Sequence, residues 1–168
     1  MPDTPVSIRP YQPPDYDACR QLWVELTERH RLIYDDPTIG GDDPGAAFDG
    51  YLATTARVES WVADAADGVV GLTGLFVDGA GGEVEPVVVA ARVRSRGIGR
   101  QLIARAVEEA GARDLEHVSI RPVARNVEAM ALFHALGFRA VGHVDMFMDL
   151  QGRAWRPGLE LHGLPYEY

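Results

Sequence analysis

The stretch from Glu83 to Ala110 constrains the fold most, because three patterns follow one another there without interruption. An apolar run that ends in consecutive valines predicts a strand. From Ile98 to Ala110 apolar residues recur with helical spacing, and Gly111 predicts the end of that helix. Strand and helix are joined by a loop that reads Arg94-Ser95-Arg96-Gly97-Ile98-Gly99-Arg100. This order is typical of a site that binds phosphate.

The chemistry of the loop supports anion binding. Glycines between a strand and a helix let backbone N–H groups turn toward an anion, and the three arginines add positive charge. A Walker loop is excluded, because its spacing is absent and the chain has no lysine. A dinucleotide fingerprint would need a third glycine where Leu102 stands, and it would not follow a hairpin. Taken alone, the loop could still be a simple helix start with solvated arginines.

The whole sequence predicts the element order β-α-α-β-β-β-α-β-α-β, with a further strand near Leu159–Leu161. Strands are expected at 6–9, 59–63, 69–77, 83–90, 117–120 and 138–150, and helices at 15–30, 44–56, 98–110 and 126–136. Because hairpins come first and a crossover helix follows, the class is α+β, with a mixed six- to seven-stranded sheet flanked by about four helices. We expect one domain over residues 1–168, with a core over about 5–150 and an aromatic C-terminal arm over 151–168.

Composition limits the classes of partner. The formal net charge of −9 argues against general affinity for nucleic acid or for an anionic membrane. No stretch approaches the roughly 18 apolar residues of a membrane span, and the N-terminus lacks the pattern of a secretory signal. The single cysteine, Cys19, allows no intrachain disulfide. We therefore expect a cytoplasmic protein that binds neither nucleic acid nor membrane, and no metal is needed to explain its folding.

Two motifs resemble those of the GNAT-type N-acetyltransferases. Arg94-x-x-Gly97-x-Gly99 after an apolar strand is similar to that family's Q/R-x-x-G-x-G/A motif. A second block is similar to the family's N-x-x-A-x-x-L-Y-x-x-x-G-F segment and reads Asn126-x-x-Ala129-x-x-Leu132-Phe133-x-x-x-Gly137-Phe138. Both motifs stand in the family's order. The resemblance implies a GNAT-like fold and an enzyme that moves an acetyl group from acetyl-CoA to a primary amine.

The resemblance also implies which residues bind the cofactor. Acetyl-CoA would bind where two parallel strands splay apart, with its pantetheine arm paired to the backbone of Val87, Val88 and Val89. Its pyrophosphate would be held by the N–H groups of Arg94, Ser95, Arg96, Gly97, Ile98, Gly99 and Arg100. Asn126 would touch the cofactor arm. Phe133 stands where the family has a tyrosine proposed to protonate the leaving thiolate, and phenylalanine cannot donate a proton. The group that protonates the thiolate is therefore open.

The general base is expected on the strand that leads into the loop. The acceptor amine must lose a proton before it attacks the thioester, often through a water molecule. Glu83 lies where many family members keep this base, and Glu85 shares its face because alternate strand residues point the same way. Two carboxylates on one half-buried face would raise one pKa toward neutrality. Either glutamate could be the base, or both could cap a hairpin end in water.

The acceptor is defined only as a small-molecule or peptide amine. The loop after the first helix could attract a cationic amine or be merely solvated, and its carboxylates are Asp35, Asp36, Asp42, Asp43 and Asp49. The C-terminal arm could cover the acceptor site, form a homodimer contact or be a loosely packed end. Phe133 also motivates a second hypothesis, in which the protein keeps the CoA site but acts as a sensor or assembly subunit with weak or no turnover.

Overall fold

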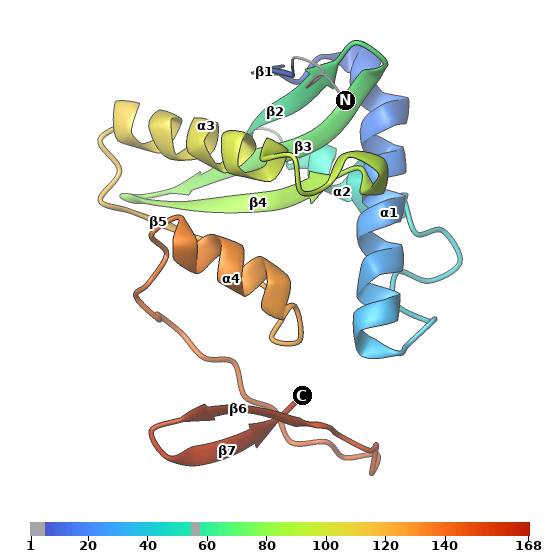
Figure 1. Ribbon diagram of the computed structural model, residues 1–168, viewed down its shortest axis with the longest axis vertical. Coiled ribbons are helices and arrows are strands. Elements are labelled where there is room, and N and C mark those ends of the chain that lie inside the picture. The colour runs from blue at the N-terminus through green and yellow to red at the C-terminus, as the bar shows by residue number, and fades with distance from the viewer. Residues whose placement is uncertain (1–5, 55–57) are drawn as a thin grey trace. The chain divides into compact units, whose positions relative to one another are not determined.

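The computed structural model (Figure 1) describes residues 6–54 and 58–168. Contacts within the chain group these residues into two compact units, Met1–Arg121 and Pro122–Tyr168. The single domain expected from the sequence stays a prediction. The expected end of the second helix at Ala56 lies outside the described residues.

The first unit contains a mixed five-stranded sheet with the strand order β1-β2-β3-β4-β5. The pairs β1–β2, β2–β3 and β3–β4 are antiparallel, whereas β5 runs parallel to β4. The five strands are β1 (Ser7–Pro10), β2 (Val58–Ala65), β3 (Gly68–Asp78), β4 (Gly81–Val89) and β5 (His117–Ser119). The α+β class and the predicted hairpin between β3 and β4 are confirmed.

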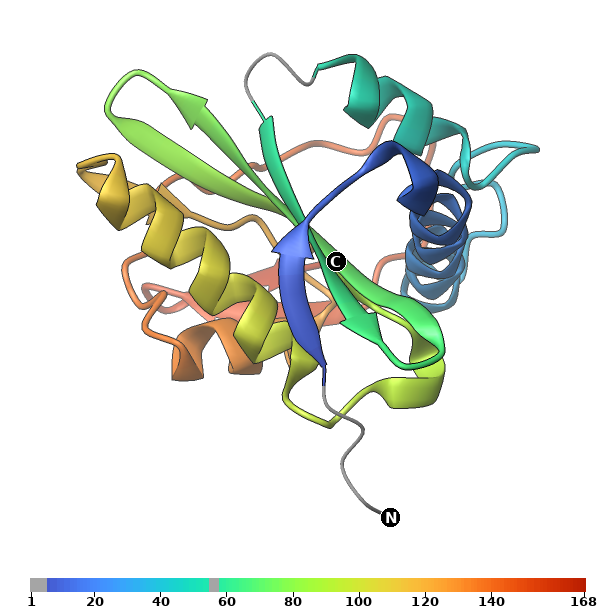
Figure 2. The same ribbon diagram turned by 90° about the horizontal axis from the view of Figure 1, so that it is seen from above.

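Helices cover both faces of this sheet. Figure 2 shows α3 (Ile98–Ala112) on one face, and α1 (Tyr16–Tyr34) with α2 (Ala46–Ala53) on the other. Short 3₁₀ turns, η1 (Pro13–Asp15) and η3 (Ala91–Val93), precede α1 and α3. The helix predicted to end at Gly111 continues to Ala112. No helix in the described ranges is both long and apolar enough to cross a membrane.

The predicted apolar stripes form the core. On α1, Cys19 and Leu22 are buried against the sheet, and on α3 Leu102 and Ala106 are fully buried. Asp15 precedes α1 as its N-cap residue, as predicted, but its carboxylate accepts hydrogen bonds from the Arg9 guanidinium at 2.7 and 2.8 Å. Those bonds hold the pKa of Asp15 below its usual value. This ion pair therefore ties the start of α1 to the first strand.

The second unit contains α4 (Val127–Ala135) and a two-stranded antiparallel sheet of β6 (Pro157–Leu161) and β7 (Leu164–Glu167). The late strand expected near Leu159–Leu161 is thus confirmed as part of β6. The seven strands of the described residues belong to two sheets, of five and two strands, where the sequence predicted one sheet.

The long strand predicted at 138–150 is wrong, since the structure assigns no strand to those residues. The prediction was based on alternating apolar residues. A strand also needs a hydrogen-bonded neighbouring strand, and neither of the two sheets in the described part of the chain includes this segment. Its apolar side chains are exposed, with Val141 at 75% and Met148 at 83%. On α4, Phe133 is buried, whereas Val127 and Met130 are exposed.

Candidate active site

Strand β4 has two neighbours only at its beginning. Gly81–Glu83 pairs with His117–Ser119 of β5, and this parallel pairing ends at Glu83 and Ser119. Further on, Val87–Val89 pairs with Gly71–Thr73 of β3 and with no other strand in the described part of the chain. A strand with an open edge can hold another extended chain by backbone hydrogen bonds. The edge at Val87–Val89 is therefore suited to a linear, amide-containing ligand.

The loop after β4 is fixed at its base. Glu25 of α1 accepts a hydrogen bond from the Ala91 N–H at 2.7 Å, and the Arg94 Nε donates to the Val89 carbonyl at 3.0 Å. Beyond this base the backbone takes left-handed conformations at Ser95 (φ 63°) and Gly97 (φ 78°). We call residues Arg94–Arg100 the phosphate loop. The sequence did not predict the contact of Glu25, because 66 positions separate it from Ala91.

The phosphate loop presents backbone donors at the start of α3. The hydrogen bond from Gln101 N to Gly97 O, at 3.1 Å, is the one that begins the helical pattern. The N–H groups of Ile98, Gly99 and Arg100 precede it and so have no acceptor within the helix. Neither Arg96 nor Arg100 forms an ion pair with another described residue. This end of α3 can therefore receive an anion.

The two glutamates of β4 lie in different environments. Glu83 forms an ion pair with Arg121, with Oε2 and Nη2 3.2 Å apart, and its side chain is 19% exposed. Glu85 is exposed when its whole side chain and backbone are considered, but its carboxyl group is partly buried. This partial burial is the largest cause of the raised pKa of Glu85. The negative charge of Glu83 raises that pKa further, and Arg121 opposes it. Glu85 is therefore the carboxylate whose pKa moves toward that of a base working near neutrality.

Arg121 was missed by sequence reasoning, although a signal existed. Glu83 lies opposite Ser119 in the parallel pair of β4 and β5. A residue two positions beyond Ser119 points to the same side of the strand, which brings Arg121 near Glu83. The strand order was thus needed to find this ion pair.

Tyr51 of α2 packs beside Glu85. A Cβ atom at Gly74 would collide with the Tyr51 hydroxyl and with the Glu85 carbonyl oxygen, so glycine permits this close approach. The Tyr51 hydroxyl shares a hydrogen bond of 2.6 Å with the Ser60 Oγ. Burial is the main cause of the raised pKa of Tyr51, which keeps its hydroxyl protonated at neutral pH. A buried hydroxyl thus borders the backbone of the Glu85 position.

A model of the GNAT acetyltransferase family matches residues 16–138 of this sequence, a range that includes the sheet from β2 on, the phosphate loop and the Asn126 motif. The chain belongs to the GNAT acetyltransferase family. The description of that family is that of acetyltransferases. An uncharacterized protein of Mycobacterium leprae is 30% identical over 143 residues, which cover 82% of this chain and 36% of the relative. The chain thus spans little more than a third of that relative's length.

Solved structures show the same fold. An acetyltransferase from Trypanosoma brucei has a TM-score of 0.64 at 22% identity, covering 87% of this chain and 100% of that one. An aminoglycoside N-acetyltransferase in complex with CoA has a TM-score of 0.65 at 18% identity, covering 89% and 99%. The PaiA N-acetyltransferase from Thermoplasma acidophilum, in complex with coenzyme A, has a TM-score of 0.70 at 13% identity, covering 84% and 93%. At these identities the similarity shows the GNAT fold alone.

The second GNAT motif lies in the second unit. Asn126 is the N-cap of α4, where its Oδ1 accepts a hydrogen bond from the Ala129 N–H at 3.2 Å. Phe133 packs against Phe138 with ring centroids 6.3 Å apart, and His134 is exposed. The structure thus explains these residues as parts of α4 and its C-terminal turn. Their expected roles at the cofactor stay predictions.

The acidic loop of this GNAT protein, residues 35–45, is largely engaged with α1. The Asp43 carboxylate pairs with Arg20, and the Asp36 Oδ1 accepts a hydrogen bond from the Thr38 N–H at 2.8 Å. Asp49 of α2 accepts a hydrogen bond from the Tyr16 hydroxyl. Asp36, Asp43 and Asp49, which were considered for the acceptor amine, therefore have structural partners.

Proposed function

We propose that this protein transfers the acetyl group of acetyl-CoA to a primary amine, with Glu85 as the general base. The observation that carries the proposal is the raised pKa of Glu85 on the strand whose open edge leads into the phosphate loop. A carboxylate with such a pKa holds a proton more readily than an ordinary glutamate, as a base must.

In this proposal the backbone binds the cofactor. The edge at Val87–Val89 pairs with the amides of the pantetheine arm, and the N–H groups of Arg94 to Arg100 bind the pyrophosphate. The Arg100 guanidinium, which has no ion-pair partner among the described residues, adds positive charge beside the phosphates. The thioester would then lie along β4 on the side of Glu85.

The chemistry is a direct transfer. Glu85 takes a proton from the acceptor ammonium, and the free amine attacks the thioester carbonyl. The new C–N bond forms as the C–S bond breaks, the nitrogen gives its second proton to water, and coenzyme A leaves as its thiolate. Arg121 holds Glu83 in place, and the charge of Glu83 keeps the pKa of Glu85 raised. Because Phe133 cannot donate a proton, the thiolate takes its proton from water.

The acceptor in this proposal is a small-molecule or peptide amine, met in the cytoplasm. Glu83 and Glu85 place negative charge at the reaction site, which favours a cationic amine over a neutral one. Asp36, Asp43 and Asp49 interact with neighbouring residues of the protein. In this proposal the acidic loop therefore contributes less than the two glutamates to binding the amine.

The test is acetyl-CoA turnover measured as thiol release across polyamines, aminoglycosides, amino acids and peptide N-termini. With an accepted amine, Glu85→Gln should lower kcat by about 100-fold or more, the usual range for loss of a general base. The KM for acetyl-CoA should change far less, because the backbone site is intact. The acidic limb of the wild-type pH profile should lie above the ordinary glutamate pKa, since the base works only when deprotonated.

Glu83→Gln is the matched variant on the same strand. It removes the charge that raises the pKa of Glu85, so the acidic limb should move to lower pH while turnover persists. Unchanged rates in both variants at every pH would show that neither glutamate is the base.

Phe133 supports a second candidate, a CoA-binding sensor or assembly protein of the same fold. Such a protein would bind acetyl-CoA and release no thiol with any amine of the panel. Binding measured by calorimetry beside the turnover assay separates the two functions.

A further inference from the structure

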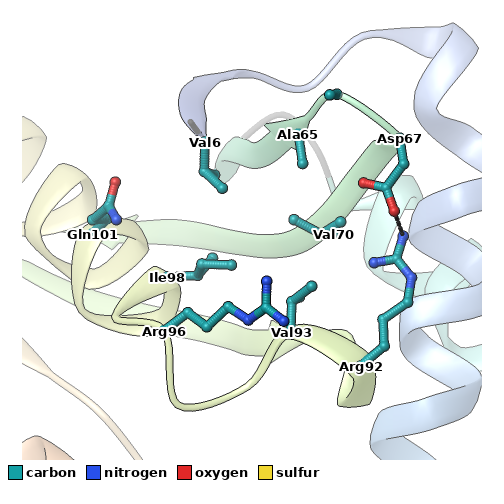
Figure 3. Close-up of a pocket in the computed structure, with 10 residues that line it drawn as sticks. Val6, Ala65, Asp67, Val70, Arg92, Val93, Arg96, Ile98 and Gln101 are labelled. Atoms are coloured by element: carbon teal, nitrogen blue, oxygen red, sulfur yellow. Dashed lines mark ion pairs between the residues drawn. The ribbon is translucent and has the colours of Figure 1, made fainter. Parts of the chain in front are cut away.

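A cavity of about 540 Å³ lies in the first unit between the β2–β3 turn and the segment that runs from η3 into α3 (Figure 3). Its described walls include no residue of β4 or β5. The cavity is therefore separate from the open edge of β4 that the proposed function uses. Its volume falls within the range of about 300–1,000 Å³ that is common for small-molecule sites.

The inner wall of the cavity is apolar. Val70 and Ile98 are buried at 0% and 3% exposure, and Val93 packs beside them. Figure 3 shows these three side chains facing the same space from β3, α3 and η3. Val70 and Ile98 leave almost no surface to water and form a closely packed floor, whereas the half-buried Val93 keeps apolar surface that a ligand can cover with a gain in free energy.

The rim of the cavity carries one uncompensated positive charge. The Arg92 Nη2 lies 3.2 Å from the Asp67 Oδ2, so these two charges neutralise each other. Arg96 forms no ion pair in the part of the chain that the structure describes, and its side chain extends along the cavity toward Val93 (Figure 3). The Gln101 amide adds a neutral hydrogen-bonding group at the other side. The complementary ligand carries a single negative charge.

We propose that this cavity binds a small monocarboxylate with an apolar body. The carboxylate pairs with the Arg96 guanidinium, which matches a carboxylate with two parallel N–H donors. The apolar body covers Val93 and rests on the floor formed by Val70 and Ile98. A single unpaired arginine above an apolar wall selects such a molecule over a neutral one of the same shape.

Binding in the cavity would also affect the phosphate loop, and this second step rests on the proposed function. Arg96 and Ile98 line the cavity with their side chains and belong to the loop whose N–H groups would hold the pyrophosphate. A carboxylate on Arg96 cancels positive charge beside that pyrophosphate. Affinity for coenzyme A should therefore fall, by about fivefold, and coenzyme A should weaken carboxylate binding by the same factor.

In the experiment, the full chain is titrated with 3-phenylpropionate in the absence of coenzyme A. Binding is measured by calorimetry and by backbone NMR shifts. We expect saturable binding with shifts at Arg96, Ile98 and Gln101, and weaker binding of the neutral 3-phenylpropan-1-ol by about tenfold or more. Arg96→Gln, an exposed substitution that leaves the fold intact, should weaken 3-phenylpropionate to the level of the alcohol. Arg113→Gln, at the other end of α3, is the control and should bind like the wild type.

A filling variant gives an independent check. Ala65→Phe should occupy the cavity and abolish binding, with its fold verified by circular dichroism. Equal binding of the acid and the alcohol, or an unchanged Kd in Arg96→Gln, would overturn the site. Coenzyme A is then titrated with and without saturating 3-phenylpropionate. An unchanged Kd for coenzyme A would overturn the coupling, whereas failure of coenzyme A to bind at all would overturn the proposed function and leave the carboxylate site standing.

Discussion

Two loops of the first unit use their polar groups in opposite ways. In the acidic loop, the Ile39 carbonyl accepts a hydrogen bond from the Nε of Arg31 in α1 at 2.8 Å, and the Gly41 carbonyl accepts one from the Nη2 of Arg31 at 2.6 Å. The phosphate loop is held at its base by Glu25 and Arg94, and its donors at the start of α3 have no helical acceptor. A loop whose polar groups bind its own protein supports the fold. A loop that is held at its base leaves its polar groups available to a ligand.

Among the variants of the two loops, Gly99→Glu should have the largest effect, and that effect should be on affinity for coenzyme A. A carboxylate in the first turn of α3 would meet the pyrophosphate and lower affinity for coenzyme A by at least about 100-fold, or about 2.7 kcal/mol. Negative charge at a helix N-terminus is favourable, so the melting temperature should not fall. Calorimetry with coenzyme A measures the change. Gly99→Gln, of the same size without the charge, is the control, and retained affinity in Gly99→Glu would refute the phosphate loop.

Arg31→Met should affect stability instead of binding. The Arg31 side chain is only 19% exposed, and its loss leaves the Ile39 and Gly41 carbonyls without their donor. We expect a loss of about 2 kcal/mol in the free energy of unfolding, measured with urea. The Kd for coenzyme A should stay the same. A weaker Kd with unchanged stability would reverse the roles of the two loops.

Glu25→Gln should have a smaller effect, confined to the phosphate loop. The neutral amide keeps an acceptor for the Ala91 N–H but loses the charge that strengthens this bond. The Kd for coenzyme A should rise by about fivefold, or about 1 kcal/mol. Glu28, one turn further along α1, pairs with Arg31, and the variant Glu28→Gln provides the control. Equal effects of the two variants would mean that Glu25 does not position the loop.

Asp43→Asn should change least. The carboxylate is 55% exposed, and exposed ion pairs such as that with Arg20 contribute less than about 1 kcal/mol. Urea unfolding in low and high salt should show a small difference that salt removes. The KM for the amine acceptor should not change. A raised KM would show that the acidic loop collects the amine as well as supporting the fold.

The sequence predicted the parts of the fold that depend on neighbouring residues. Periodicity placed the core faces of α1 and α3, and the glycine-rich turn placed the hairpin of β3 and β4. Contacts across the sequence were harder to foresee. The ion pair of Glu83 with Arg121 required the strand order, and the hydrogen bond of Glu25 to Ala91 required the packing of α1.

The segment 138–150 shows that a local pattern can also predict an element that does not form. Its alternation is a local property and predicted a strand, but a strand exists only where another strand accepts its hydrogen bonds. Residue type did identify Phe133 as a side chain without a proton to donate, which holds in any fold. Both glutamates could be named as candidate bases from the sequence, and their surroundings were needed to favour Glu85.

The open edge of β4 and the start of α3 offer N–H and carbonyl groups that every residue type except proline supplies in full. Exchange of their side chains during evolution therefore leaves such a surface largely unchanged, as long as the chain follows the same path. Family members can then drift far apart in sequence, as the 13% identity at a TM-score of 0.70 illustrates. The positions least free to vary are those that fix the path, such as Gly97 with its positive φ and Gly74 beneath Tyr51.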